Sequence, residues 1–219
     1  MKIEVIYEDN HLLAVVKPQG IPVQKDIGKK EDLQTILKSY LKEKYNKPGN
    51  IYLGIVHRLD QPVGGVILFA KTSKAASRLS EQVKNNEWER EYLAVVDGIP
   101  KEKKGELKDY LLKNSETNTV SVVSKETKKA KFAKLKYEVI EKSNAKALVK
   151  ISLETGRSHQ IRVQFANSGH PIANDQRYNR EAQKGKEIAL WAFSLTVIHP
   201  VKNEKLTFSK EMPPELKTL

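Results

Sequence analysis

The chain has 219 residues, which is enough to bury a hydrophobic core as one large domain or as two small ones. No apolar run approaches the length that a helix needs to cross a bilayer, and the first residues lack the apolar segment of a signal peptide. The absence of cysteine excludes disulfides, a thiol nucleophile and cysteine-ligated metal centres. We therefore expect a cytoplasmic protein without a membrane association.

The charge is strongly positive. Lysine and arginine number 39 against 27 aspartates and glutamates, which gives a net charge of +12. Such an excess favours polyanionic partners, because each cation placed on a phosphate releases a condensed counterion. A lysine-rich solubility surface would give the same excess, so charge alone leaves both interpretations open. The five histidines show no spacing typical of metal ligands, and we expect no metal site.

The first half of the chain alternates between strand and helix patterns. Residues 4–16 predict two strands joined by a turn at Glu8, Asp9 and Asn10. Apolar residues at helical spacing predict a helix over residues 32–45. Further elements are then expected: strands at 51–56, 65–70 and 92–96, and a helix at 73–86.

The second half is dominated by strands. The polar stretch 101–131 predicts hairpins on an exposed flank. Residues 132–139 and 145–153 predict an antiparallel hairpin that turns at Ser143 and Asn144. Ser158 is expected to cap a helix that ends near Gly169. Strands at 190–198 and 205–208 complete an α+β fold with a mixed, mostly antiparallel sheet and flanking helices. We expect one domain over residues 1–219.

Two polar clusters interrupt this pattern. The first, His57-Arg58-Leu59-Asp60, separates two apolar segments, although an aspartate at such a place is often only a turn former. The second surrounds the start of the helix near residue 158. There Arg162 lies at the edge of the apolar face, where its stem can follow apolar surface and its guanidinium can bind a carboxylate. A surface helix whose basic face contacts phosphates is the alternative.

Four segments in the same order resemble one known family. Residues 57–65, His-Arg-Leu-Asp-Gln-Pro-Val-Gly-Gly, are similar to the HRLD-x-x-x-S-G signature of RluA-type pseudouridine synthases. The other matching segments are residues 17–23 (K-P-x-G), 90–98 (K/R-x-Y-x-A-x-V-x-G) and 155–163 (T-G-R-x-H-Q-I/L-R-V), the last continued by 169–172. The similarity spans nearly the whole chain, from Val5 to about Phe208.

The resemblance implies a pseudouridine-synthase fold with a basic RNA-binding cleft, and an isomerase that acts on uridine in ribosomal or transfer RNA. It implies that Asp60 is the catalytic aspartate that attacks the uridine. It also implies that Tyr92 stacks on the target base, that Arg162 pairs with the catalytic carboxylate, and that Arg58 enters the space left by the flipped uridine. Four further residues are expected to position the loops: His57, Arg157, His159 and Gln160, the two histidines by hydrogen bonds to the backbone.

The chemistry of these residues suits such a reaction. A uracil inside folded RNA is inaccessible, so the enzyme must extrude it and offer a stacking surface. Asp60 is the nucleophile that the first cluster offers, and carboxylates form covalent adducts with sugars. Rearranging the base needs no redox group, so we expect no cofactor. Attack on the ribose and attack on the base both remain open.

Some features depart from the family pattern. Gly64 stands where the family has serine, and Asn174 and Asn179 stand where it has glycines. We expect no separate N-terminal RNA-binding domain, a monomer, and RNA recognition by basic surface that includes residues 101–136. Two other classes of protein are the alternatives. A non-catalytic RNA-binding or ribosome-assembly protein could keep the scaffold, and a glycosidase would need a second acid that the matched segments do not show.

Overall fold

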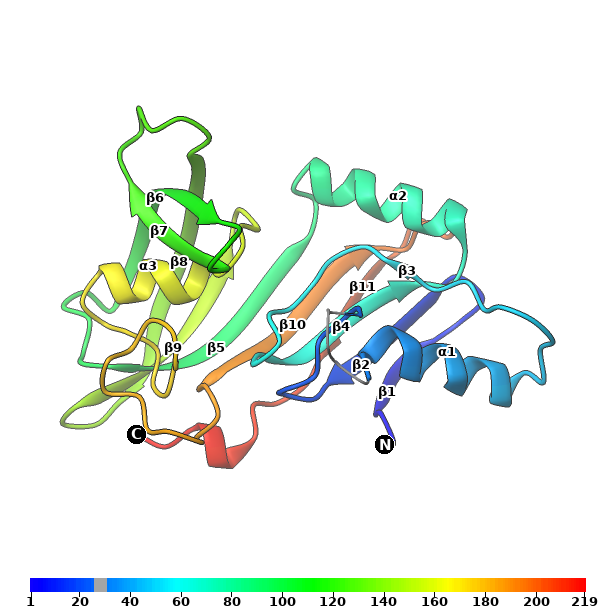
Figure 1. The fold of residues 1–219 in the computed structure, drawn as a ribbon, viewed down its shortest axis with the longest axis horizontal. Helices are drawn as coiled ribbons and strands as arrows, with labels where there is room; N and C mark the ends of the chain where they lie inside the picture. The colour runs from blue at the N-terminus through cyan, green and yellow to red at the C-terminus, as the bar shows by residue number, and fades with distance from the viewer. Residues whose placement is uncertain (26–30) are drawn as a thin grey trace. The chain divides into compact units, whose positions relative to one another are not determined.

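The computed structural model describes residues 1–25 and 31–219. By its internal contacts the chain divides into two compact units, one of residues 1–89 and 192–211 and the other of residues 90–191 and 212–219. Strands and helices occur in both units, which confirms the predicted α+β class (Figure 1). None of the helices within these ranges is long and apolar enough to span a membrane.

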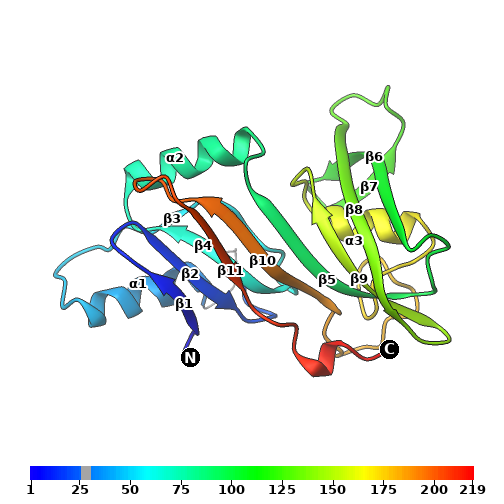
Figure 2. The ribbon, with the colours of Figure 1, turned by 180° about the vertical axis from the view of Figure 1, so that it is seen from behind.

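The first unit contains a sheet whose strands are mainly paired antiparallel. Its strand order is β1-β2-β4-β10, with β3 paired to β4 and β11 paired to β10, as Figure 2 shows from behind. Residues 4–16 form the predicted pair of strands with a turn between them. The elements are β1 (Val5–Glu8), β2 (Leu12–Lys17), α1 (Leu33–Lys44), β3 (Gly54–Ile55), β4 (Gly64–Ala70), α2 (Ser73–Lys84), β10 (Leu190–Ile198, from residue 192) and β11 (Lys205–Ser209).

Both faces of this sheet are buried. One face packs under α2, where Ala75 and Leu79 contact residues of β2, β4, β10 and β11. The alternate residues of β2 and β4, such as Leu13 and Phe69, point to the opposite face and are also fully buried. Burial on both faces explains why β4 is a continuous apolar run rather than an alternating one.

The two helices of this unit begin at the predicted places. The Asp32 side chain accepts the Thr35 N–H at 3.0 Å, and the Thr72 hydroxyl accepts the Ala75 N–H at 3.2 Å. Each cap satisfies an N–H that has no partner inside its helix. The predicted helices at 32–45 and 73–86 are thereby confirmed to within one or two residues.

The second unit is a meandering antiparallel sheet with one helix. Its strand order is β5-β9-β8-β6-β7. The predicted hairpin is confirmed as β8 and β9, and it turns where the Ser143 N–H donates to the Lys146 carbonyl at 2.9 Å. The elements are β5 (Glu89–Asp97, from residue 90), β6 (Lys104–Asn114), β7 (Thr119–Val123), β8 (Lys131–Lys142), β9 (Lys146–Leu153), α3 (Gln160–Asn167) and a short 3₁₀ helix (Pro214–Leu216).

The start of α3 differs from the prediction. Ser158 does not cap the helix, which begins at Gln160 after His159 in a left-handed conformation with φ of 51°. Instead, the Gln160 side chain reaches back and accepts the Arg157 N–H at 3.0 Å. The expectation of a serine cap was wrong because this side-chain bond, and not the hydroxyl, satisfies a donor before the first turn. The helix then packs Val163 against Leu111 and Ala133 of the sheet.

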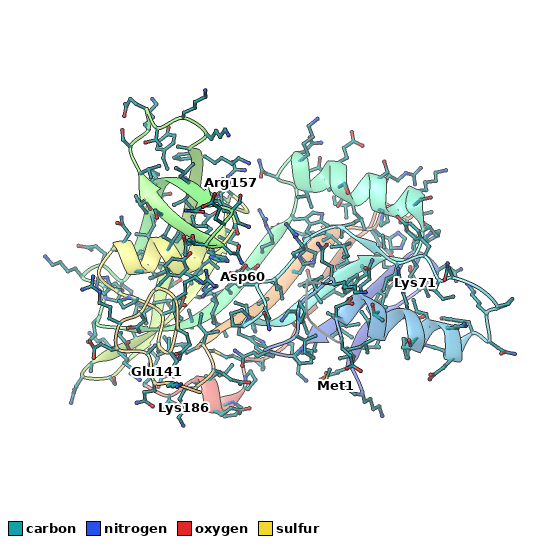
Figure 3. The ribbon with its side chains drawn as sticks, in the orientation of Figure 1. Met1, Asp60, Lys71, Glu141, Arg157 and Lys186 are labelled. Carbon is teal, nitrogen blue, oxygen red and sulfur yellow. The ribbon has the colours of Figure 1, made fainter. Side chains whose placement is uncertain are left out.

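A buried carboxylate ties β1 to α1. Glu8 accepts hydrogen bonds from the hydroxyls of Tyr40 and Tyr45 and from the ammonium groups of Lys44 and Lys71. Lys71 is labelled in Figure 3. Burial opposes ionisation of Glu8, but these four donors outweigh it and lower its pKa to about 2. The folded state therefore depends on an ionised Glu8.

This carboxylate predicts an acid-sensitive stability. A folded-state pKa below the unfolded value stabilises the fold above about pH 4.5, and that stabilisation is lost as the pH falls from about 4.5 to about 2. Glu8→Gln should lower the free energy of unfolding at pH 7 and flatten its pH dependence in this range. Urea unfolding at several pH values measures both effects. Glu43→Gln, at an exposed position of α1, is the control, and a Glu8→Gln curve parallel to wild type would contradict the account.

Candidate active site

Asp60 lies on a tight turn between β3 and β4 in the first unit, where Figure 3 labels it. The turn is closed by a hydrogen bond from the Val63 N–H to the Asp60 carbonyl at 3.0 Å. Leu59 is buried, whereas Asp60 itself is partly exposed. The apolar neighbour thus anchors the loop, while Asp60 keeps part of its surface exposed.

A buried lysine lies beneath this turn. Lys17, at the end of β2, is fully buried, and its ammonium group donates to the carbonyls of Gln61 at 2.9 Å and Val63 at 2.7 Å. A third bond goes to the carbonyl of Pro18 at 3.0 Å. Three carbonyl acceptors satisfy the three donors of an ammonium group, which offsets part of the cost of its burial.

Further bonds join the same two segments. The Gly20 N–H donates to the Gln61 carbonyl at 3.0 Å, and the Gln61 side chain donates back to the Gly20 carbonyl at 2.7 Å. The Gln19 side chain donates to the Pro62 carbonyl at 3.0 Å. Residues 17–20 therefore hold the backbone on the C-terminal side of Asp60 at several points. The sequence shows residues 17–23 only as a match to the K-P-x-G segment. It does not identify Lys17 as a site residue.

The environment of Lys17 is electrostatically unusual. Burial lowers the pKa of its ammonium group to about 7, and the negative charge of Asp60 acts in the opposite direction and raises it. The interaction implies that the Asp60 carboxylate is close enough to affect a fully buried cation. The loop thus combines an accessible carboxylate with a buried positive charge.

The other residues of the first cluster have distinct surroundings. The His57 Nε2 accepts the Leu68 N–H at 2.9 Å, so this ring is neutral and carries its proton on Nδ1. Its ring also packs edge-on against Trp88, with centroids 5.1 Å apart. Arg58 is exposed and forms no hydrogen bond or ion pair with the described residues. His57 therefore positions the loop, while the Arg58 side chain is available to contact another molecule.

The glycines after the loop have a packing role. Gly65 adopts a φ of +115°, and a Cβ there would lie 2.2 Å from the Ala192 carbonyl oxygen of β10. Only glycine permits so close a backbone approach. Gly64, which precedes it, is buried at the start of β4. The strand that follows Asp60 is thus fixed against its neighbour.

In the second unit, Tyr92 lies on β5 opposite Ile151 of β9, with 9% of its surface exposed. Nearby, the Arg90 guanidinium lies against Gly156, where a Cβ would be 2.4 Å from its Nη1 atom. Burial lowers the pKa of the Arg90 guanidinium. The glycine of the Thr-Gly-Arg segment therefore leaves room for the Arg90 side chain.

Arg162 forms a buried two-point ion pair with Asp175. Its Nε donates to Oδ2 at 2.8 Å and its Nη2 donates to Oδ1 at 2.7 Å. Asp175 is fully buried and also accepts the N–H groups of Arg177 and Tyr178. This arrangement fixes the plane of the guanidinium. Sequence reasoning does not select Asp175, although it lies in the segment 174–179 that departs from the family pattern.

The remaining predicted residues surround the start of α3. The Gln160 side chain accepts from the Thr155 hydroxyl at 2.8 Å and donates to the Lys134 carbonyl at 3.1 Å. The His159 Nδ1 is hydrogen-bonded to the Tyr178 hydroxyl at 2.7 Å. Arg157, labelled in Figure 3, donates through Nε to the Phe132 carbonyl at 2.9 Å. Gln160 and Arg157 thus connect the segment to β8, and His159 connects it to the loop that carries Tyr178.

The predicted residues belong to both units. His57, Arg58 and Asp60 share one loop of the first unit, and the residues around α3 share one segment of the second unit. Among the described residues, no group of three or more histidines, cysteines, aspartates or glutamates could hold a metal ion.

Comparison with known sequences gives a consistent set of matches. The family described as RNA pseudouridylate synthase matches residues 11–167. The ribosomal large subunit pseudouridine synthase D of Zymomonas mobilis is 32% identical over 99% of this chain and 71% of its own length. The ribosomal large subunit pseudouridine synthase C of Pasteurella multocida is 32% identical over 99% of this chain and 66% of its own length.

Solved structures support the fold. The human RNA pseudouridylate synthase domain-containing protein 4 superimposes with a TM-score of 0.81, at 21% identity, over 97% of this chain and 90% of that chain. The human RNA pseudouridylate synthase domain-containing protein 1 gives a TM-score of 0.79 at 20% identity, over 99% of this chain and 86% of that chain. The predicted fold is thereby confirmed.

The buried Lys17 predicts a stability that rises with pH. Its folded pKa of about 7 lies below the unfolded value of 10.5, so the unfolded chain binds more protons between these values. The free energy of unfolding should therefore increase between about pH 7 and 10, by up to about 1.4 kcal/mol per pH unit. Lys17→Met should lack this increase, whereas the exposed-site control Lys42→Met should retain it. Denaturant unfolding measures the difference, and identical pH dependence in all three proteins would refute the prediction.

Proposed function

Because this chain belongs to the RNA pseudouridylate synthase family, we propose that it converts uridine in RNA to pseudouridine through attack by the Asp60 carboxylate. The observation that carries the proposal is the support of the Asp60 turn by the buried Lys17 and its neighbours. A nucleophile on a fixed turn loses less freedom when it meets its target than one on a mobile loop. The partial exposure of Asp60 leaves its carboxylate accessible to a substrate.

The reaction balances without an external reactant. The bond between uracil N1 and ribose C1′ breaks, and a bond between uracil C5 and C1′ forms. The proton on C5 leaves and N1 gains a proton, so the composition of the RNA is unchanged. A carboxylate that forms a transient covalent bond, either to C1′ or to uracil C6, holds one fragment while the base turns. No electron is gained or lost in either route.

Arg162 is proposed to hold the Asp60 carboxylate in its ionised form. The match of residues 155–163 to the family segment supports this role, and the fixed guanidinium plane makes it chemically suitable. A guanidinium has five N–H donors, and Asp175 uses two of them, so one group can serve two carboxylates. We also propose that residues 1–219 form a single catalytic domain.

Tyr92 and Arg58 are proposed to handle the flipped nucleotide. Tyr92 would stack on the extruded base, and Arg58 would fill the space that the base leaves in the RNA. The exposure of Arg58, and the absence of hydrogen-bond or ion-pair partners for it among the described residues, support its insertion into a substrate.

The proposed substrate is ribosomal RNA. The two bacterial relatives named above are ribosomal large subunit pseudouridine synthases, and the net charge of +12 suits a polyanion of any sequence. Transfer RNA is the alternative. Mapping pseudouridine across cellular RNA, with and without the gene for this chain, distinguishes the two substrates.

Asp60→Asn tests the chemistry most simply. The substitution keeps the size and shape of the side chain but removes its nucleophilic charge, so turnover should fall by at least about a thousandfold while RNA binding persists. Release of tritium from RNA that carries uridine labelled at C5 measures turnover.

The wild-type protein is the reference, and Asp109→Asn, at a partly exposed position of β6, is the matched control. Turnover by Asp60→Asn at the wild-type rate would rule out the proposed role. Tight RNA binding without release by the wild-type chain would instead identify a non-catalytic RNA-binding protein.

A further inference from the structure

Lysines in the stretch 101–136 differ in how far their charge is neutralised. Those in the middle of β6 and β8 are neutralised by glutamates on the same sheet face. Lys134 lies 3.0 Å from Glu154 and 3.2 Å from Glu106, and Lys136 lies 2.8 Å from Glu154. Such lysines have little charge to offer a polyanion, because an approaching phosphate must compete with a carboxylate already in place.

The loop between β7 and β8 is different. Its three lysines, and Lys131 at the start of β8, are exposed and form no ion pair within the part of the chain that the structure describes; the loop lysines are Lys125, Lys128 and Lys129. The single acidic residue among them, Glu126, accepts a hydrogen bond from the Ser124 hydroxyl. The loop and the first residue of β8 therefore present four uncompensated cations against one carboxylate.

This loop has a defined shape. The Thr127 N–H donates to the Ser124 carbonyl and the Ala130 N–H donates to the Thr127 carbonyl, both at 3.0 Å, so two turns follow one another. Lys129 adopts a left-handed conformation with φ of 69°. The lysines are thus displayed on an ordered backbone, which lowers the entropic cost of binding a ligand.

An aromatic pair lies where the loop ends. Tyr110 of β6 and Phe132 of β8 are direct neighbours across the two strands, with ring centroids 5.6 Å apart. Phe132 keeps 41% of its surface exposed. Cross-strand aromatic pairs also stabilise sheets, so the pair alone would have a purely structural explanation. This pair differs from a purely structural one because it lies beside uncompensated lysines. In addition, the Phe132 carbonyl accepts a hydrogen bond from Arg157.

We propose that these residues form a binding site for an unpaired segment of RNA, in which a base stacks on Phe132 and the lysines contact phosphates. We call this surface the aromatic–lysine patch: Tyr110, Lys125, Lys128, Lys129, Lys131 and Phe132. Exposed aromatic rings beside cations are suited to single strands, because the base faces are accessible there and are hidden in a duplex. The inference rests on the proposed function and specifies which part of the substrate this surface holds.

The charge contribution is tested with the triple variant Lys128→Glu, Lys129→Glu, Lys131→Glu. The probe is a fluorescent single-stranded oligouridylate of about twelve nucleotides. We expect its affinity to fall by at least about tenfold, and the slope of log K against log salt to become shallower by about 0.7 for each phosphate that the variant no longer neutralises. The control triple variant is Lys42→Glu, Lys74→Glu, Lys84→Glu. It makes the same change in net charge at exposed helix positions. An equal fall in affinity in the two triple variants would refute the proposed site.

The stacking contribution is tested with two substitutions at one position. Phe132→Leu keeps an apolar side chain but removes the ring, and should weaken binding of the single strand by about tenfold. Phe132→Tyr keeps the ring and should bind as wild type does. The variants Phe132→Leu and Phe132→Tyr should bind an RNA duplex of equal length with the same affinity. Wild-type affinity of Phe132→Leu for the single strand, in a protein with an unchanged melting temperature, would contradict the inference.

The two proposals fail in different ways. Suppose that the wild-type chain releases tritium and that substitutions in the patch leave the affinity for single-stranded RNA unchanged. That result would overturn this inference and leave the proposed reaction standing. If the wild-type chain binds the single strand through the patch but releases no tritium, this inference is supported and the proposed reaction is overturned.

Discussion

The buried ammonium group of Lys17 is the interaction on which the candidate site most depends. A lysine without solvent contact is costly unless its donors are satisfied, and here they bind three backbone carbonyls, two of which belong to the Asp60 loop. Apolar side chains could fill the same space but could not bind carbonyl oxygens. The position of the loop is therefore determined by the end of β2, a segment more than forty residues earlier in the chain.

The second unit uses the same principle with other groups. A buried carboxylate fixes the Arg162 guanidinium, and the Gln160 side chain joins the start of α3 to the neighbouring strand β8. Glycines contribute by leaving space, since Gly65 and Gly156 each lie where a Cβ would collide with a neighbour. In both units, residues with proposed chemical roles are held by buried polar contacts and close backbone approaches rather than by apolar packing alone.

The sequence predicts the regular elements well because their apolar residues recur with clear periods. The β1–β2 pair, both helices of the first unit and the β8–β9 hairpin lie where the pattern places them. The pattern does not show that Lys17 is buried, because a lysine after an apolar strand normally marks its exposed end. Asp175 is not predicted as a partner of Arg162, because a pattern of residues does not show that its carboxylate is buried. The left-handed His159 escapes prediction because that conformation depends on contacts, such as that with Tyr178, between residues distant in sequence.

We infer that the reactivity of Asp60 depends on the position that Lys17 gives to its loop. The most direct test is the single-turnover rate of pseudouridine formation by Lys17→Met, measured with saturating enzyme at a temperature where the variant is folded. Misplacement of a reacting group by about 1 Å costs on the order of a hundredfold in rate, so we expect a decrease of that size with RNA affinity within about twofold of wild type. A single-turnover rate equal to that of the wild-type chain would contradict it.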